Sequence, residues 1–588
     1  MASKLIDSLR RLEYRGYDSA GIAVVGAQGL DLRRASGCVD RLAAVVRDDR
    51  PEGTVGIAHT RWATHGAPTD VNAHPHAFDG VAVVHNGIVE NHAELKWWLS
   101  DLGHEFVTET DSEVLPHIIA KMRRDGMDHR QAVAATLEYA KGSLALAAVF
   151  EDAPDRIVVA RRGSPLAVAI SEDGAYVSSD PAAFDAVGGR FTHLEDGEVA
   201  ELTRGDVWFD GADGDARRNR WEPVVLPQDG GDPRAGHSSF MAKEMAEQPD
   251  AWSRTVASAR AFAGVEELAA ADRIAIVACG SSYYAGLMAR AWFEREAGLA
   301  CDIEVASEFR HRGGVLSERQ VVLCLSQSGE TADTLAVIEE MRAAGRRTFA
   351  LVNTARSAMT RAADRCWLTD AGREIGVAAT KTFTAQVAAL VVLALRVAHA
   401  RGRIDADRLE KALDGLASLS DMIRQTLALE GRMASAASAF ADRRSAFYLG
   451  RGPAFAAALE GALKLKEIGY VQAEAYAAGE LKHGPIALIE PGVPVVVVAP
   501  SDHLFEKTLS SAQEVKARGA RLLLLTDAGG AARAGRLADD TVVLPGADAW
   551  AVTVSAVIAL QFLARHIATA RGLDVDRPRN LAKSVTVE

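Results

Sequence analysis

Hydrophobic residues in the first part of the chain occur in short runs that alternate with polar turns. Runs of small and β-branched apolar residues at 21–25, 80–90, 144–150 and 156–162 are separated by segments that contain Gly and Asp. This pattern is typical of antiparallel strands accompanied by a few helices. It predicts an α+β domain, built from antiparallel sheets with helices, over residues 1–225.

The pattern changes after residues 226–249, a segment rich in Gly, Pro, Asp and Ser that we interpret as a linker. Apolar runs are then followed by long Ala- and Leu-rich stretches, and strands that alternate with helices favour parallel, doubly wound sheets. This order occurs twice, which predicts two α/β doubly wound domains, at 250–405 and 439–575. We expect residues 406–438 to form a helical connection between them and residues 576–588 to form a C-terminal tail.

Two longer apolar stretches, around 387–400 and 551–570, are candidates for membrane spans. Polar residues interrupt both of them, among them Arg396 and Arg565, and a span needs about 20 predominantly apolar residues. We therefore expect two core helices and no contact with a membrane. The first residues of the chain also lack the basic and then apolar pattern of a secretory signal.

The composition fits several folded domains in one cytoplasmic chain. With 588 residues, 48% of them hydrophobic and 25% charged, three or four domains are expected at about 150 residues each. The formal net charge of −13 makes nucleic acid a poor partner, because a negative surface repels phosphate backbones. The five cysteines show no CxxC spacing, which indicates reduced thiols in the cytoplasm.

Hydroxyl side chains gather where two successive strands of the first α/β domain are expected to end. Ser281 and Ser282 follow one strand, and the next strand is followed by Ser326, Gln327, Ser328 and Thr331. Carboxyl ends of parallel strands form the usual ligand crevice and a helix N-terminus favours an anion, so we predict a phosphate site. The alternative is that a serine merely caps the following helix. Without a Walker lysine pattern or a G-x-G-x-x-G motif, the phosphate is expected to belong to a small metabolite.

Several strings, in order along essentially the whole chain, resemble one enzyme family. LRRLEYRGYDSAG, AHTRWATHG, NAHPH, VVHNGIVEN and TETDSE are similar to the class II glutamine amidotransferase domain of glutamine:fructose-6-phosphate aminotransferases. SQSGETADT, GREIGVAATKTFT, EGALKLKE, AEAYAAGELKHGP and RPRNLAKSVTVE are similar to the sugar isomerase (SIS) domains of that family. The resemblance implies an amidotransferase domain of the N-terminal-nucleophile type followed by two SIS domains. It also implies conversion of fructose 6-phosphate and glutamine to glucosamine 6-phosphate and glutamate, the first step of hexosamine synthesis.

Isomerising a ketose requires a group that moves a proton between C1 and C2. Lys464 and Glu467 lie three residues apart in a helical stretch and therefore share a face. The same spacing is also common in solvated ion pairs of helices. The resemblance implies that Glu467 moves the proton and that Lys464 assists it.

Four further assignments for the sugar come from the resemblance alone. His483 is implied to open the sugar ring, and Lys583 to form an imine with the open ketose as the tail folds over the sugar. Ala582 and Val377 are implied to contact the sugar through their backbones. The implied sugar-phosphate ligands are Ser281, Ser282, Ser326, Gln327, Ser328 and Thr331.

The resemblance also implies a glutamine pocket in the first domain. Arg61 would bind the α-carboxylate, because its guanidinium fork can hold two oxygens, although an ordinary surface ion pair is the alternative for a single arginine. Asp111 would take the α-ammonium group, and Asn86 and Gly87 would form the oxyanion hole. The other implied pocket residues are Trp62, which is also a candidate gate for ammonia, Thr64, His65 and Arg15.

The nucleophile that this resemblance implies is absent from the sequence as given. Family members begin with a cysteine whose thiol attacks the amide and whose own α-amino group acts as the base. Here the sequence opens with the helix expected after that strand, and Cys38 lies in a different segment. We therefore expect no glutaminase activity from these 588 residues. Three hypotheses remain: about a dozen further upstream residues carry the nucleophile, the enzyme uses free ammonia or only isomerises, or glutamine binding is regulatory.

Two other classes of function can be distinguished from an aminotransferase by residues that they would not need. A non-catalytic sugar-phosphate sensor would keep the serine cluster but not Glu467, His483 and Lys583, and an isomerase for another sugar phosphate would not need the amidotransferase domain. We expect no metal, because the histidines show no ligand set beyond the pair at 74–76, and no cofactor, because the substrate's own imine can serve. The resemblance implies a homodimer, in which a histidine of one subunit completes the sugar site of the other.

Overall fold

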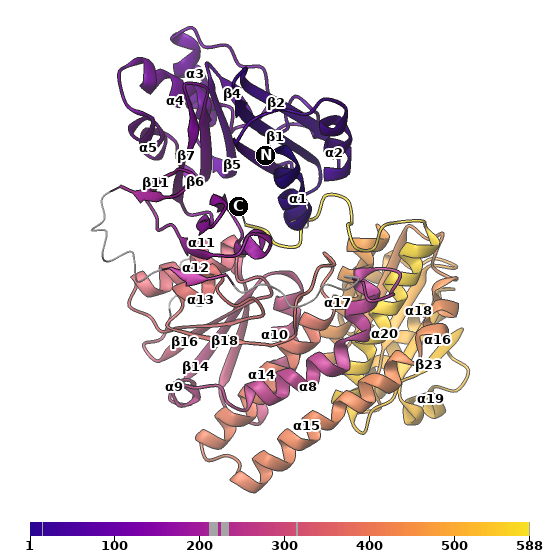
Figure 1. The fold of residues 1–588 in the computed structure, drawn as a ribbon. Coiled ribbons are helices and arrows are strands. Elements are labelled where there is room, and N and C mark those ends of the chain that lie inside the picture. The colour runs from indigo at the N-terminus through magenta and orange to yellow at the C-terminus, as the bar shows by residue number, and fades with distance from the viewer. Residues whose placement is uncertain (14–15, 211–220, 225–233, 313–315, 587–588) are drawn as a thin grey trace. The chain divides into compact units, whose positions relative to one another are not determined.

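A computed structural model describes residues 1–588 except 14–15, 211–220, 225–233, 313–315 and 587–588. The chain forms two compact units (Figure 1). The N-terminal unit comprises Met1–Gly230 with Arg579–Glu588, and the C-terminal unit comprises Gly231–Pro578.

The N-terminal unit contains three antiparallel sheets (Figure 1). The largest has the order β12-β11-β7-β6-β5-β4 and consists of β4 (His76–Phe78), β5 (Val81–Val89), β6 (Gly142–Phe150), β7 (Ala153–Arg162), β11 (Val199–Leu202) and β12 (Val207–Phe209). A three-stranded sheet has the order β2-β1-β3, with β1 (Ser19–Gly26), β2 (Gly29–Ser36) and β3 (Val55–Arg61). A four-stranded sheet has the order β13-β10-β8-β9, with β8 (Ala167–Ser171), β9 (Gly174–Ser178), β10 (Arg190–His193) and β13 (Glu222–Pro223).

Alternating side chains of β6 show how these sheets are layered. Leu144 and Leu146 pack in one buried cluster with α4 (Val114–Arg124) and α5 (His129–Tyr139). Ala145 and Ala147, on the other face, share a cluster with strands β1, β3 and β8. The two smaller sheets therefore cover one face of the large sheet and helices cover the other, as the period-2 pattern of half-buried strands requires. Further helices are α1 (Ala2–Leu12), α2 (Val39–Asp48) and α3 (His92–Asp101). The predicted α+β class is confirmed.

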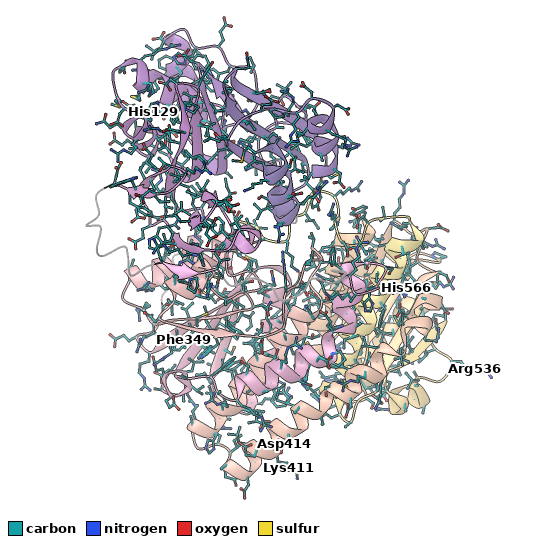
Figure 2. The ribbon with its side chains drawn as sticks, viewed as in Figure 1. His129, Phe349, Lys411, Asp414, Arg536 and His566 are labelled. Atoms are coloured by element: carbon teal, nitrogen blue, oxygen red, sulfur yellow. The ribbon has the colours of Figure 1, made fainter. Side chains whose placement is uncertain are left out.

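The C-terminal unit contains two five-stranded sheets, and their described strands pair in parallel. The first has the order β15-β14-β16-β17-β18, with β14 (Arg273–Ala278), β15 (Ala300–Val305), β16 (Gln320–Ser326), β17 (Thr348–Val352) and β18 (Arg365–Leu368). The second has the same order, β20-β19-β21-β22-β23, with β19 (Ser445–Gly450), β20 (Gln472–Ala477), β21 (Pro494–Val498), β22 (Arg521–Thr526) and β23 (Asp540–Val543). These are the two predicted doubly wound domains. Buried side chains pack against both sheets, and among them Phe349 on β17 is fully buried (Figure 2).

The helices of this unit follow from the strand–helix alternation. The first domain and the segments before it contain α7 (Phe240–Ala246), α8 (Gln248–Ala259), α10 (Gly280–Arg295), α12 (Ala332–Ala343) and α14 (Lys381–Ala400). The second domain and the helical connection contain α15 (Ala406–Leu427), α16 (Glu430–Ala437), α17 (Pro453–Gly469), α18 (Phe505–Lys516) and α20 (Ala549–Ala570).

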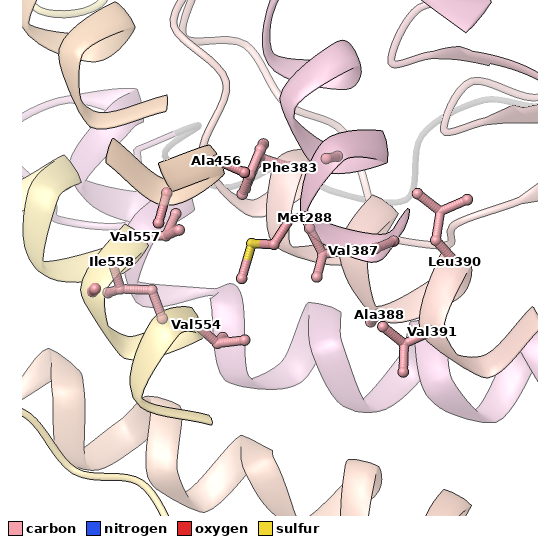
Figure 3. Close-up of a cluster of buried hydrophobic side chains, with 14 of the residues drawn as sticks. Met288, Phe383, Val387, Ala388, Leu390, Val391, Ala456, Val554, Val557 and Ile558 are labelled. Atoms are coloured by element: carbon pink, nitrogen blue, oxygen red, sulfur yellow. The ribbon is translucent and has the colours of Figure 1, made fainter. Parts of the chain in front are cut away.

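Helices α14 and α20 form the centre of the unit. Among the described residues both are long and apolar enough to cross a membrane, yet 83% and 89% of their most apolar windows are buried inside the structure. Met288 of α10 lies among Phe383 and Val387 of α14 and Val554 and Val557 of α20 (Figure 3). The two apolar stretches are core helices, as predicted.

The predicted linker, 226–249, is helical at its C-terminal end. Residues 225–233 lie outside the described part of the chain, but Ser239 caps α7 and its hydroxyl accepts a backbone N–H at 3.0 Å. Met241 and Met245 on α7 are buried in the core of the C-terminal unit. Because the two methionines are buried and the serine caps the helix, this end of the segment is part of the C-terminal unit. The beginning of the segment is rich in Gly and Pro.

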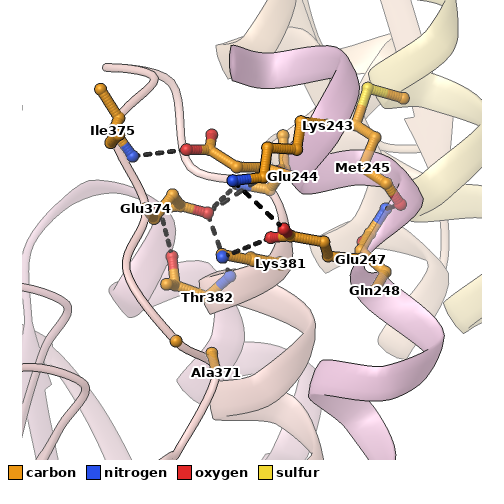
Figure 4. A network of polar contacts seen from close by, with 12 residues as sticks. Lys243, Glu244, Met245, Glu247, Gln248, Ala371, Glu374, Ile375, Lys381 and Thr382 are labelled. Atoms are coloured by element: carbon orange, nitrogen blue, oxygen red, sulfur yellow. Dashed lines mark hydrogen bonds and ion pairs between the residues drawn. The ribbon is translucent and has the colours of Figure 1, made fainter. Parts of the chain in front are cut away.

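A network of buried charges fixes the loop between β18 and α14, which contains Val377 (Figure 4). Glu374 is buried and accepts hydrogen bonds from the N–H of Thr382 at 3.1 Å and from its hydroxyl at 2.6 Å. Lys381 Nζ lies 2.6 Å from Glu247 Oε2, which ties the start of α14 to the end of α7. Because buried carboxylates are stable only when donors surround them, this network holds the loop in one conformation.

Candidate active site

The first parallel sheet has a topological switch point between β14 and β16, where ligands bind in open α/β sheets. Ser281 and Ser282 lie in the first turn of α10, directly after β14. The loop of residues 326–331, which joins β16 to α12, follows the neighbouring strand. The two predicted hydroxyl-bearing turns therefore come from adjacent strands at this point.

The hydroxyls of the 326–331 loop bind the loop itself. Ser326 Oγ accepts the N–H of Gly329 at 2.9 Å and lies 3.0 Å from Thr331 Oγ1. Ser328 Oγ accepts the N–H of Glu330 at 3.1 Å. Thr331 occupies the N-cap position of α12 without a capping bond from its side chain. The alternative interpretation, in which these serines simply cap the helix, does not describe this geometry.

Gly329 makes the tight course of this loop possible. It has φ of +67°, a left-handed conformation that favours glycine, and a Cβ there would lie 2.1 Å from the hydroxyl oxygen of Ser357. The carbonyl of Gln327 accepts the N–H of Asn353 at 3.1 Å. The loop is thus anchored to its neighbours on both sides of Ser328.

Helix α17 carries three charged residues on one face. Lys464 Nζ lies 2.5 Å from Glu467 Oε2 and 3.4 Å from Glu460 Oε1. The side chains of Lys464 and Glu460 are 0% and 1% exposed, and that of Glu467 is 20% exposed. The shared face of Lys464 and Glu467 was predicted, and their burial rules out the alternative of a solvated ion pair.

Burial and mutual charge set the protonation of this group. Burial raises the pKa of Glu460 to about 7, against the opposing effect of the Lys464 ammonium. Burial alone would lower the pKa of Lys464, but the carboxylates of Glu460 and Glu467 outweigh it and raise that pKa. Lys464 is therefore an ammonium at neutral pH beside a carboxyl group that titrates there. Such an arrangement can hold and move protons.

Ser281 connects this helix to the switch point. Its hydroxyl donates to Glu460 Oε1 at 3.0 Å and accepts a hydrogen bond from Lys464 Nζ at 3.1 Å. The sequence predicts Ser281 as a phosphate ligand, but its bonds here are to the charges of α17, and Ser282 is the half-buried neighbour on the same turn.

Sequence reasoning missed Glu460. It stands four residues before Lys464 and seven before Glu467, which is the spacing of one helix face. The signal was therefore present in the string EGALKLKE, whose first letter is Glu460.

Three further predicted sugar residues lie in other segments of the chain. His483 lies in the short helix Glu480–His483, where its side chain is exposed and makes no hydrogen bond or ion pair with a described residue. Ala582 and Lys583 are half-buried in the segment Arg579–Glu588, which groups with the N-terminal unit. Their roles at the sugar stay predictions.

The N-terminal unit contains a cavity of about 840 Å³. Its lining includes most of the residues predicted to bind glutamine: Arg61, Trp62, Thr64, Asn86, Gly87 and Asp111. His65 lies just behind this lining, with its Nδ1 3.9 Å from Asp111 Oδ1. Arg15 lies outside the described residues.

Arg61 and Asp111 are both buried and both line this cavity, which excludes a surface ion pair for Arg61. Arg61 ends β3, and its guanidinium donates to the backbone carbonyls of residues 65–67. Burial lowers its pKa, although the charge of Asp111 acts in the opposite direction. Asp111 accepts the N–H of Val89 at 2.7 Å. One cation and one anion are thus held rigidly at the same cavity, as an amino acid's two charges require.

Gly87 on β5 can only be glycine. Its φ is +151°, and a Cβ would lie 2.0 Å from the carbonyl oxygen of Ser143 on β6. The close approach of β6 leaves the backbone of Asn86 and Gly87 at the cavity. The role of these two residues as an oxyanion hole stays a prediction.

Histidines also lie at the cavity, and of these the sequence singled out only the pair at 74–76. His59, His74 and His85 belong to its lining, and the ring of His76 meets that of His74 edge to face. Burial lowers the pKa of all four, to about 3 for His59 and His76, so they are neutral at pH 7. Among the described residues no group of three or more His, Cys, Asp and Glu is arranged to hold a metal ion.

The edge strands of two sheets border this cavity. Residues of β3, at the edge of the three-stranded sheet, and of β9, at the edge of the four-stranded sheet, both line it. Edge strands present backbone N–H and C=O groups that a further strand can pair with. None of the five cysteines, all of which lie in the described part of the chain, belongs to the lining, and Cys38 precedes α2.

Comparison with known families finds the same three domains in the same order. The model of the glutamine amidotransferase domain matches residues 60–186. The model of the SIS domain matches twice, at residues 267–396 and 439–568. The second and third stretches coincide with the two parallel sheets.

Relatives match the whole chain. An isomerizing glutamine–fructose-6-phosphate aminotransferase of Rhizobium leguminosarum bv. viciae is 45% identical over 604 residues, covering 100% of this chain and 98% of the relative. One from Zymomonas mobilis is 45% identical over 599 residues, with the same coverage. The solved C-terminal domain of glucosamine-fructose-6-phosphate aminotransferase from Francisella tularensis is 37% identical, has a TM-score of 0.57, and covers 59% of this chain and 100% of its own. With its domains, their order and its full length thus matched, the chain belongs to the family of isomerizing glutamine–fructose-6-phosphate aminotransferases.

Proposed function

We propose that the C-terminal unit converts fructose 6-phosphate to glucosamine 6-phosphate. The observation that supports this most strongly is a pair of hydrogen bonds: Ser281 donates one to Glu460 and accepts one from Lys464. They join the turn at the phosphate crevice to the buried acid–base helix. A ligand whose phosphate sits at the 326–331 loop therefore has its carbon chain within reach of α17.

The reaction divides between binding, carbonyl activation and proton transfer. The 326–331 loop and the N-terminus of α12 hold the phosphate. The Lys583 amine condenses with the C2 carbonyl of the open ketose and releases water, and ammonia then displaces the lysine. Glu467 removes a proton from C1 and returns it to C2, while the proton of the C1 hydroxyl passes to nitrogen. The C2 imine becomes an amine and C1 becomes an aldehyde.

Lys464 and Glu460 assist this transfer. The Lys464 ammonium is fixed between two carboxylates. It stabilises the negative charge that develops during enolisation on the oxygen of C1 and on the nitrogen of C2. Ser282 contributes to the phosphate site, and the backbone of Val377, in its rigid loop, and of Ala582 orients the sugar.

The enzyme works as a homodimer in the cytoplasm. His483 opens the sugar ring of a second copy, which accounts for a catalytic histidine that is exposed within its own chain. The net charge of −13 and the burial of α14 and α20 give it no surface for nucleic acid or membrane.

The N-terminal unit binds glutamine. Arg61 takes the α-carboxylate and Asp111 the α-ammonium group, while Asn86 and Gly87 face the amide carbonyl. Trp62, Thr64 and His65 shape the pocket together with Arg15, and Trp62 gates the passage of ammonia.

Residues 1–588 alone aminate the sugar with ammonia and not with glutamine, because no thiol lines the cavity among the described residues. No described strand pairs with the outer edges of β3 and β9, which supports the hypothesis that an extended segment pairs between them and carries a thiol to Asn86. A purely regulatory glutamine site and a non-catalytic sensor are the alternatives, and the buried acid–base group of α17 speaks against the sensor.

The test compares two nitrogen donors and two forms of the chain. Glucosamine 6-phosphate and glutamate are measured with ammonium chloride or with glutamine, for the 588-residue chain and for a form extended from the upstream reading frame. We expect the short form to use ammonium alone and the extended form to use both. Glutamate release by the short form would refute the role given to the missing thiol. Inactivity of the extended form with glutamine would refute the strand hypothesis, and no product in any arm would refute the sugar chemistry.

A further inference from the structure

The second parallel sheet has a switch point of its own. Its strand order, β20-β19-β21-β22-β23, repeats that of the first sheet, so the equivalent crevice lies between the carboxyl ends of β19 and β21. The turn 451–453 follows β19, and residues 499–504 follow β21. None of the residues assigned so far to sugar or glutamine lies in these two turns.

A cavity of about 260 Å³ occupies this position. Both turns line it, and the remaining walls come from the C-terminal end of α10 and the first turns of α20. All of these elements belong to the C-terminal unit. The repeat of the fold has thus kept a cavity at the place where the first domain has its phosphate loop.

Positive charge dominates the polar lining. Arg451 and Arg295 make no hydrogen bond or ion pair with any residue that the structure describes, and the Nε of Arg451 is buried without a partner. The two acidic groups of the lining are already engaged: Glu296 pairs with Arg408 at 2.9 Å, and Asp502 Oδ1 accepts the N–H of Leu504 at 2.8 Å. His503 adds a third basic group, with its Nδ1 4.0 Å from Asp502 Oδ2.

Arg295 alone would not indicate a ligand. It is exposed in the last turn of α10, where a basic residue complements the helix dipole. Arg451 has no such explanation, because it follows a strand and precedes Gly452, the N-cap of α17. An arginine whose buried guanidinium nitrogen has no acceptor leaves a desolvated donor unsatisfied, which a bound anion would relieve.

Two tryptophans give the cavity an apolar wall. Trp292 and Trp550 meet edge to face, with ring centroids 5.5 Å apart. The Nε1 of Trp550 is buried and has no hydrogen-bond partner among the described residues. Indole faces with an unsatisfied donor suit a small polyhydroxylated carbon chain, since C–H groups pack on the ring and an oxygen can accept the N–H.

We propose that this cavity is a second binding site, for a small phosphorylated sugar. Its phosphate pairs with Arg451 and Arg295 at the N-terminus of α17, and its carbon chain lies against Trp292 and Trp550. Pockets for drug-sized ligands measure about 300–1,000 Å³, so a cavity of about 260 Å³ suits a small ligand such as a hexose monophosphate.

The second site shares two helices with the sugar site. Arg295 and Trp292 lie on α10, whose first turn carries Ser281, and Arg451 borders α17, which carries Lys464 and Glu467.

The test counts binding sites on the full chain with labelled sorbitol 6-phosphate, which has no carbonyl and cannot react. Equilibrium dialysis is expected to give two molecules per chain for the wild type and one for the Arg295→Gln, Arg451→Gln double variant. Removing one charged hydrogen bond costs about 10- to 100-fold in affinity, so the second site empties at the concentration that fills the first. Arg536→Gln, an exposed arginine of the same domain (Figure 2), is the matched control and should keep both sites.

Further arms separate the possible outcomes. Trp550→Phe is a milder variant that serves if the double variant does not fold. It is expected to lower the affinity of the second site for the label about 3- to 10-fold. Inorganic phosphate that displaces the label from both sites equally would show that the cavity binds phosphate without reading the sugar, against the proposal. Equal stoichiometry in the wild type and both pocket variants would overturn it. Ser326→Ala is expected to empty the other site, and if it does not, the proposed sugar site fails independently.

Discussion

Both units place buried charged groups at a crevice or a cavity, but they differ in the reacting groups that lie there. In the C-terminal unit, Lys464 and Glu467 lie 2.5 Å apart on one helix beside the phosphate crevice. In the N-terminal unit, Arg61 and Asp111 can bind an amino acid, yet no thiol lines the cavity among the described residues. Binding groups and reacting groups are therefore separable in this chain.

The two sites are also built in different ways. The acid–base group is built within one helix, so its geometry depends on local spacing. The glutamine pocket is assembled from strands β3 and β5 and the turns beside them, and it borders two open sheet edges. The first site therefore depends on local sequence and the second on packing between segments.

The largest effect is expected from Glu467→Gln. Loss of a positioned proton-transfer group should lower the rate of ammonia-dependent glucosamine 6-phosphate formation by about 10²- to 10⁴-fold. Glu474→Gln is the matched control, because Glu474 pairs with Lys466 at the surface. Equal rates for the two variants would remove the acid–base role of α17.

A smaller effect, confined to the other unit, is expected from Gly87→Ala. A Cβ 2.0 Å from the Ser143 carbonyl oxygen must displace backbone, which should destabilise the N-terminal unit by about 3 kcal/mol. Gly126→Ala is the control, because Gly126 also has a positive φ but nothing within 4 Å of the added carbon. Thermal unfolding of the two variants separates the effect of the clash from that of backbone strain, because only Gly87→Ala has both. Similar losses of stability in both variants would contradict the role given to β6.

Arg61→Lys should affect glutamine alone. A lysine cannot hold both carboxylate oxygens, so glutamine affinity measured by calorimetry should fall about 10- to 100-fold. Ammonia-dependent sugar amination should not change, and Arg47→Lys at an exposed site should change neither. A parallel loss of sugar amination would show that the two functions are not separable.

The smallest effect is expected on the stability of the N-terminal unit at acidic pH. His59 and His76 have a pKa of about 3 in the folded N-terminal unit, against about 6.5 when unfolded. Between these values the unfolded chain binds more protons, so the stability of the unit is complete above pH 6.5 and falls as the pH drops towards 3. Hydrogen exchange in β3 and β5 should report this fall, and His59→Gln should reduce it. The same pH dependence in His59→Gln as in the exposed control His237→Gln would contradict the assignment to buried histidines.

Much of the fold follows from local sequence patterns. The alternation of Leu144 to Ala147 specifies a strand packed on both faces, and the apolar runs after residue 250 specify parallel strands. Part of the predicted linker is helical, since one cap and two methionines outweigh a Gly- and Pro-rich context. Long-range packing, which a local pattern does not contain, decides such segments.

The sites divide in the same way. The common face of Lys464 and Glu467 could be predicted from spacing, and Glu460 could have been found by the same rule. The bond between Ser281 and Glu460 could not, because 179 residues separate them. The cavity at the second switch point likewise depends on the paired order of β19 and β21 and on Trp292 from the first domain.

The most direct test of the central claim is a competition between two nitrogen sources. The 588-residue chain is given fructose 6-phosphate with nitrogen-15 ammonium and unlabelled glutamine, and the glucosamine 6-phosphate formed is analysed by mass spectrometry. We predict that the product nitrogen comes from ammonium and that no glutamate is released. Product that carries unlabelled nitrogen from the glutamine amide would contradict the account.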